Sequence, residues 1–234
     1  MARWGRTGTD DGGKDLPVAP LARHMPSTLV HVALAGLLAC ALLGDAFGTR
    51  SVAVVLGATI LIDFDVFLGW FVLGTHRAAF HTLLLPLVVG VLLYYDVRLR
   101  DRSWLATRWG ESAPRVAGVT LVTVLVAGIG PDLVTNGANL LYPVHDQFYA
   151  FDGRLRFSTE RGVLQTFVEE ESAKGSTRTQ QYFTGADPNP EKTGTSNVTE
   201  TTERVFLLVD TGMQLLLVLA GAVTTGWRLW ESRR

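Results

Sequence analysis

Apolar residues gather in stretches about as long as a bilayer is thick, and this feature constrains the fold more than any other. A helix needs about 20 consecutive apolar residues to cross the hydrocarbon core. With 47% hydrophobic and only 18% charged residues, the chain is predicted to be an all-α polytopic membrane protein with about five transmembrane helices. The stretches are Ser27–Gly44, Ser51–Leu73, Phe80–Tyr95, Val116–Leu141 and Val205–Trp227.

The predicted helices divide the chain into four parts. The polar N-terminal segment is rich in Gly, Arg and Asp, a composition typical of a flexible tail. The parts are residues 1–25 as this tail, 26–145 as the membrane domain with helices one to four, 146–203 as an extramembrane region, and 204–234 as the fifth helix with a basic C-terminal tail.

The extramembrane region begins with a predicted β-hairpin. Gln147–Phe151 and Arg154–Phe157 alternate as strands do, and they flank Asp152-Gly153. An Asp-Gly pair between two such runs favours a two-residue type I′ turn. Val163–Val168 is a candidate for a further strand, and the chain from Ser172 to Thr202 is expected to be a linker.

Charge and cysteine content exclude several function classes. A formal net charge of −1 gives no basic signature for nucleic acid, so no nucleic-acid partner is expected. The single cysteine, Cys40, excludes an intramolecular disulfide and a cysteine zinc cage. The partners expected are the lipid bilayer and a small-molecule or lipid-like substrate.

Basic residues predict the orientation in the cell membrane. Arginines that flank short loops are retained on the cytoplasmic side. They gather in the link between helices three and four and after helix five, so the C-terminus is predicted to be cytoplasmic and the N-terminus outside. These residues are Arg98, Arg100, Arg102, Arg108 and Arg115, and then Arg228, Arg233 and Arg234.

Several His and Asp residues lie inside or beside the apolar stretches. Ionisable side chains at membrane depth cost a few kcal/mol each on insertion scales, about 3 kcal/mol at the centre of a helix, and therefore indicate a function or a partner. The predicted topology brings most of them to the outer half of the membrane. They are His31, Asp63, Asp65, His76, His81, Asp132 and Asp210.

This residue set is typical of a site for a divalent metal ion. Imidazole and carboxylate groups are ligands of zinc, which is the metal expected first, with manganese or iron as alternatives. Asp63 and Asp65 pose a geometric problem, because residues two apart on a helix point about 200° apart. Either the helix is broken there, or one aspartate supports a ligand rather than being one. Asp210 is an extra candidate ligand, with an ion pair to Arg77 as the alternative.

Short motifs in a fixed order resemble the family of membrane-bound metal-dependent hydrolases, also described as LexA-binding, inner-membrane-associated hydrolases. The resemblance covers about residues 25–170, and two histidines five apart with an arginine after the first are its most specific element. The matching segments are Met25–His31, Asp63–Asp65, His76–Thr82, Asp132–Gly137 and Leu140–Pro143.

The resemblance implies a metal site on a helical membrane scaffold, without predicting LexA as a partner of this chain. One position departs from the family pattern, because Gly128 stands where the family usually has a histidine four residues before the aspartate. A lost ligand could weaken the site, abolish activity, or be replaced by Asp210 or His145. The implied ligands are His31, Asp63, Asp65, His76, His81 and Asp132.

The implied chemistry is hydrolysis by a metal-activated water, with Asp63 or Asp65 as the base. Arg77 is a candidate for binding an anionic group, and the membrane location favours a phosphodiester or lipid-like substrate. Two other functions remain open: a small ion-coupled transporter, and a non-catalytic membrane scaffold with a degenerate metal site.

Overall fold

A computed structural model describes residues 26–72, 74–151, 155–165, 173–180, 182 and 206–234. The predicted tail, residues 1–25, lies outside these described residues, as does the predicted linker over residues 183–202.

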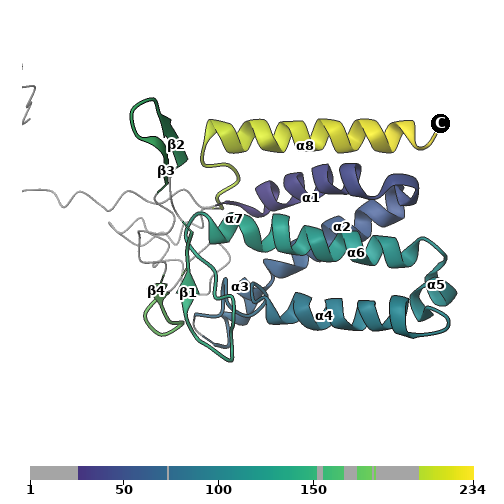
Figure 1. The fold of residues 1–234 in the computed structure, drawn as a ribbon, viewed down its shortest axis with the longest axis horizontal. Helices are drawn as coiled ribbons and strands as arrows, with labels where there is room; N and C mark the ends of the chain where they lie inside the picture. The colour runs from purple at the N-terminus through teal and green to yellow at the C-terminus, as the bar shows by residue number, and fades with distance from the viewer. Residues whose placement is uncertain (1–25, 73, 152–154, 166–172, 181, 183–205) are drawn as a thin grey trace, which may run out of the picture.

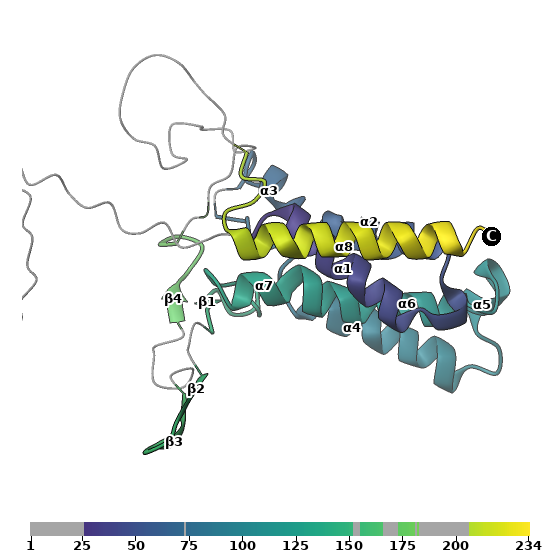
Figure 2. The ribbon, with the colours of Figure 1, turned by 90° about the horizontal axis from the view of Figure 1, so that it is seen from above.

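The described helices form a bundle with similar axes (Figures 1 and 2). Helix α1 is central and packs against α8, α2 and α6. The core at these contacts uses small side chains, with Ala35, Ala39 and Ala127 fully buried beside Leu43 and Val55. Small residues let the helix backbones approach closely. The long elements are α1 (Thr28–Leu42), α2 (Thr49–Ile62), α4 (Leu84–Tyr94), α6 (Ala113–Thr123) and α8 (Gly212–Glu231).

Shorter helical elements lie at the two ends of this bundle. The figures show α5 at one end and α3 with the strands at the other (Figures 1 and 2). Two of the elements are π-helical, a wider turn that is often found at functional sites. They are η2 (Tyr95–Leu99) and η3 (Val124–Ile129); the others are η1 (Gly44–Ala46), α3 (Asp65–Leu68), α5 (Trp104–Trp109) and α7 (Gly130–Leu133).

The prediction of five transmembrane helices is wrong. Within the described residues, two helical segments are long and apolar enough to cross a membrane, Thr49–Leu68 and Ala113–Leu133. Helix α1 has 15 residues and α4 has 11, which at helical rise is about 22 and 17 Å, short of a core about 30 Å thick. Helix α8 has 20 residues, but polar residues such as Gln214 and Arg228 lower its mean hydropathy.

The apolar stretches overestimate the lengths of these helices, because parts of the stretches are not helical. The stretch predicted from Phe80 loses its first turn to a loop, and α4 begins only at Leu84. The stretch predicted from Val205 becomes helical only at Gly212. Hydropathy counts such residues as membrane-like although their backbone is not helical.

Two small antiparallel sheets follow α7, so the chain is not all-α. Strand β1 (Phe148–Tyr149) pairs with β4 (Ala173–Gly175), and β2 (Leu155–Ser158) pairs with β3 (Gly162–Gln165). The predicted pairing of β1 with the segment after Asp152-Gly153 is therefore wrong, and that dipeptide lies outside the described residues. The hairpin lies one strand later, with its turn at Thr159–Arg161. The further strand predicted from Val163 is present as β3.

The link from α7 to β1 depends on a glycine. Gly137 has a φ of +106°, and its N–H donates to Asp132 O at 2.8 Å. A Cβ at this position would lie 2.9 Å from Tyr149 O. Only glycine combines this left-handed backbone with so close an approach, so the turn holds β1 against the end of α7.

Candidate metal centre

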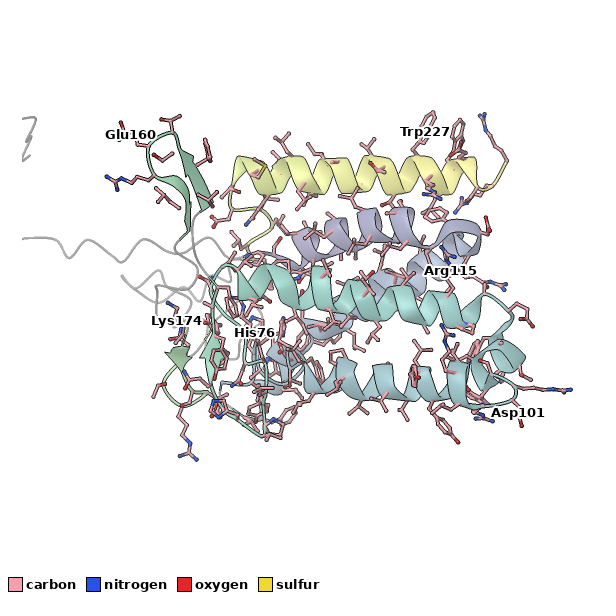
Figure 3. The ribbon with its side chains drawn as sticks, in the orientation of Figure 1. His76, Asp101, Arg115, Glu160, Lys174 and Trp227 are labelled. Carbon is pink, nitrogen blue, oxygen red and sulfur yellow. The ribbon has the colours of Figure 1, made fainter. Side chains whose placement is uncertain are left out.

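Four ionisable side chains from separate segments meet at the end of the bundle that carries α3 and α7. His31 lies on the first turn of α1, Asp63 follows α2, His81 precedes α4, and Asp132 is on α7. Three of the four side chains are at most 2% exposed, and Asp63 is 16% exposed. Figure 3 shows this end of the bundle, where His76 is labelled.

Ligand atoms of three of these groups, His31, Asp63 and Asp132, lie close enough together to share one cation, and His81 lies beside the two carboxylates. His81 Nε2 lies 2.9 Å from Asp132 Oδ2 and 3.7 Å from Asp63 Oδ1. His31 Nε2 lies 3.9 Å from Asp132 Oδ2. Ligand atoms on a tetrahedral zinc ion are about 3.3 Å apart, given bonds of about 2.0–2.1 Å. One atom each from His31, Asp63 and Asp132 lies within 4.8 Å of the others, so this buried group could hold a metal ion.

The helix is interrupted between the two neighbouring aspartates. Helix α2 ends at Ile62 and α3 begins at Asp65, with Asp63 N donating to Ile60 O at 3.1 Å in a tighter turn. This interruption turns the Asp63 carboxylate toward His81 while Asp65 is fully buried behind the same ring. The geometric problem of two carboxylates 200° apart on one helix therefore does not arise.

Asp65 joins two histidines through its two oxygens. His76 Nδ1 donates to Oδ1 and His81 Nδ1 donates to Oδ2, each at 2.8 Å. A carboxylate on Nδ1 fixes the ring orientation and leaves Nε2 as the ligand atom. Asp65 therefore holds His81 with Nε2 toward Asp63 and Asp132, and does not itself reach the group.

His31 is oriented in the same way by a backbone carbonyl. Its Nδ1 donates to Ala127 O at 2.7 Å, and Ala127 belongs to the π-helical η3. The Nε2 atom is thereby left facing Asp132. Both imidazoles thus have Nδ1 engaged and Nε2 directed at the carboxylates, which is the usual arrangement around a bound metal.

Arg77 positions the remaining carboxylate. Its Nη2 lies 2.7 Å from Asp132 Oδ1, both side chains are 2% exposed, and its guanidinium stacks 4.8 Å from the ring centroid of Tyr182. Arg77 has a φ of +61°, a strained conformation for a non-glycine residue that is typical of functional sites. Asn139 supports this backbone by donating its N–H to Arg77 O at 2.9 Å.

The electrostatics of the site favour the protonated, cationic form of the His81 imidazole. Burial alone would lower the pKa of His81, but the carboxylates of Asp65 and Asp132 raise it from 6.5 to about 10. Without a metal, the ring is therefore protonated at neutral pH, and the proton on Nε2 stands where a metal ion would bind. A metal ion has to replace this proton.

The residues present fit a divalent metal ion. An imidazole nitrogen of His31 and the carboxylates of Asp63 and Asp132 form a donor set that could hold a metal ion, with the His81 imidazole beside the two carboxylates. Asp63 Oδ2 is buried and makes no hydrogen bond. A buried carboxylate oxygen without a hydrogen bond is costly unless a cation or a water satisfies it.

Three of the predicted ligands do not join the four-residue group, namely Asp65, whose oxygens face the Nδ1 atoms of two histidines, His76 and Asp210. His76 lies on the far oxygen of Asp65, with its ring centroid 6.2 Å from that of His81. Asp210 is exposed and precedes α8 by two residues, where its N–H donates to Gln214 Oε1 at 3.0 Å.

Sequence reasoning missed three supporting groups: the Ala127 carbonyl, Asn139 and the Tyr182 ring. No residue type marks a carbonyl as a hydrogen-bond acceptor in advance. Asn139 lies between the segments Asp132–Gly137 and Leu140–Pro143, so its polarity beside apolar residues was an available signal. Tyr182 is 105 positions from Arg77 in the chain, and no local pattern connects them.

No protein-family model matches this chain. Comparisons with curated proteins and with solved structures likewise find no matching protein. The functional assignment therefore depends on the geometry of this chain's own residues.

Proposed function

We propose that the protein is a membrane-bound, metal-dependent hydrolase in which His31, Asp63, His81 and Asp132 hold a divalent ion. Zinc is the first choice of metal, with manganese or iron as alternatives. One observation carries the proposal: both imidazoles have Nδ1 bonded to an oxygen and Nε2 directed at two carboxylates. The resemblance of its sequence motifs to those of the membrane-bound metal-dependent hydrolases supports the same proposed function.

When bound, such an ion would activate water and polarise the bond to be cleaved. Asp63 is the most accessible carboxylate of the group, and its Oδ2 makes no hydrogen bond. It can therefore accept the proton of the attacking water. Asp65 accepts from two histidines and from Phe80 N, so we assign it to orienting His81 instead.

Arg77 can contribute to substrate binding as well as to positioning. Its Nη2 engages Asp132, whereas Nε and Nη1 make no hydrogen bond although they are buried. These two N–H groups suit an anionic oxygen. A phosphodiester or lipid-like substrate would present one at the membrane surface.

We further propose that the chain crosses the cell membrane with the metal centre at the outer end. Thr49–Leu68 and Ala113–Leu133 are the candidate spans, and the lateral surface of α4 is apolar, with Leu87 and Leu92 each 62% exposed. Arg115 lies at the end of the bundle opposite His76 (Figure 3), and the C-terminus lies at that same end, near α5 (Figure 1). Positive residues favour the cytoplasmic side.

The test begins with the metal content of the full-length protein purified in detergent. We expect about one transition metal per chain, and we expect Asp132→Asn to lose most of it while the exposed Asp101→Asn retains it. Hydrolysis of a phosphodiester probe should then require added metal and Asp63. Metal-free wild-type protein after metal supplementation would refute the proposal.

The two alternative functions give different results in the same preparation. An ion-coupled transporter would move cations across liposomes and hydrolyse nothing. A non-catalytic scaffold would bind metal weakly or not at all and would show neither activity. Cation flux and probe hydrolysis, measured on the same reconstituted protein, therefore separate the three.

A further inference from the structure

A groove lies at the end of the bundle opposite the metal centre. It has a volume of about 420 Å³ and opens to the surface between α4 with η2 and the start of α6. Its walls are apolar apart from two arginines. The lining includes Leu93, Tyr94, Val97, Arg98, Pro114 and Arg115.

Backbone features shape the groove. Gly90 also lines it, and a Cβ there would lie 3.1 Å from Leu121 Cδ2, so the glycine keeps α4 close to α6. Beyond α4, the wider π-helical turn of η2 carries Val97 and Arg98. The Asp96 carboxylate of this turn accepts from Ser103 Oγ at 2.6 Å and from Trp104 N at 2.7 Å, which fixes the turn to the start of α5.

The two arginines leave positive charge at the groove. Arg98 is exposed and, among the described residues, has no carboxylate within ion-pair distance, whereas the neighbouring Arg100 lies 3.8 Å from Asp96. Arg115 donates from Nε and Nη2 to Leu42 O at 3.2 and 2.9 Å. A carbonyl carries no net charge, so the charge of Arg115 is not neutralised either.

Exposed aromatic residues surround this end. Trp104 and Trp109 on α5 are 55% and 66% exposed, and Trp227 on α8 is 63% exposed. Figure 3 shows Trp227, Arg115 and Asp101 at the same end of the bundle. Tryptophan with arginine is the residue combination found at the headgroup level of membranes, and basic clusters attract anionic lipids.

We propose that this groove binds an anionic phospholipid, with an acyl chain along its apolar wall and the headgroup phosphate between Arg98 and Arg115. The apolar lining accounts for the chain and the two unneutralised guanidinium groups for the phosphate. The site is independent of the metal centre, because it lies at the other end of the bundle.

The test compares lipid binding by the full-length protein in a neutral detergent, read by native mass spectrometry. Phosphatidylglycerol is expected to bind at least about tenfold more tightly than phosphatidylcholine, given about 1 kcal/mol for each basic residue near an anionic surface and two such residues here. Arg98→Glu should remove most of this preference. The matched control is Arg102→Glu, which changes the net charge equally four residues further along the chain but lies outside the lining.

A second variant tests the apolar wall. Val97→Asn replaces an apolar residue of the lining, 41% exposed, by a polar one and should weaken the binding of both lipids, with the helical circular dichroism of the protein unchanged. Equal binding of the two lipids would overturn the proposal. So would an equal effect of Arg98→Glu and Arg102→Glu, or a Val97→Asn protein that is folded and binds as wild type does.

Discussion

The Nδ1 atom of His81 lies 2.8 Å from Asp65 Oδ2, and this contact directs Nε2 of the same ring at Asp132. Asp65, which the sequence predicts to be a ligand, thereby orients the ring of His81 instead. The distinction has measurable consequences, because a supporting carboxylate and a coordinating carboxylate affect metal binding to different extents.

Asp65→Asn is expected to weaken metal binding without abolishing it. The amide cannot accept from both imidazoles as a carboxylate does, so His81 loses its fixed tautomer and orientation. Removal of such a supporting group lowers metal affinity by about 10- to 100-fold. A competition titration with a metal-binding dye measures this effect.

The companion variant for Asp65→Asn is Asp132→Asn, which removes a coordinating oxygen and should lower the affinity further. Equal losses in the two variants would contradict the supporting role of Asp65. The exposed Asp101→Asn serves as the control, since it lies at the other end of the bundle (Figure 3).

Asp132→Asn should also destabilise the metal-free protein strongly. It leaves the Arg77 guanidinium, 2% exposed, without its carboxylate, and breaking one side of a buried ion pair costs about 3–5 kcal/mol. Adding Arg77→Met should restore part of this loss, because the unpaired charge is then gone. Chemical denaturation in detergent with chelator present measures the free energy of unfolding of four proteins: wild type, Asp132→Asn, Arg77→Met and the double variant.

A surface pair provides the comparison for Arg77 and Asp132. Arg100 is 46% exposed and lies 3.8 Å from Asp96, so Arg100→Met should cost no more than about 1 kcal/mol. If Asp132→Asn costs as little as that, the buried pair contributes nothing and the positioning role of Arg77 is wrong.

Metal affinity should rise with pH. His81 has a pKa of about 10 in the metal-free fold against an ordinary value of 6.5. Metal and proton compete for Nε2, so below pH 10 the apparent affinity should increase about tenfold for each pH unit as long as one proton is released. Isothermal titration between pH 6 and 8 in buffers of different ionisation enthalpy counts that proton. A pH-independent affinity would show that His81 is already neutral before the metal binds.

The same pKa sets the pH dependence of the metal-free protein's stability. Because the pKa is raised on folding, the stabilisation from protonated His81 is fully present below about pH 6.5 and is lost as the pH rises through about 10. With chelator present, the free energy of unfolding should therefore fall toward alkaline pH. Exposed His145 is the control position, since His145→Gln should leave this slope unchanged.

The residues that meet at the candidate site could be predicted from the sequence, but the separate roles of the carboxylates could not. Ionisable groups within apolar stretches pointed to His31, Asp63, His81 and Asp132, since burial at membrane depth demands a reason. Whether Asp65 coordinates or supports depends on the break in the helix after Ile62, and no glycine or proline marks that break. The predicted number of transmembrane helices was wrong for a related reason, because hydropathy counts apolar residues and does not show where a helix ends.

Gly128 is expected to be needed for packing in this chain. A Cβ at Gly128 would lie 2.4 Å from Ile62 Cδ1, and Ile62 directly precedes Asp63. Gly128→Ala should therefore cost about 1–3 kcal/mol through overpacking and weaken metal binding by displacing Asp63. Adding Ile62→Val, which removes the clashing methyl, should recover stability and metal affinity together.

Gly118, whose Cβ would meet nothing within 4 Å, is the control, and Gly118→Ala should be neutral or stabilising. Equal tolerance of alanine at both glycines would show that this packing contact has no influence on the site.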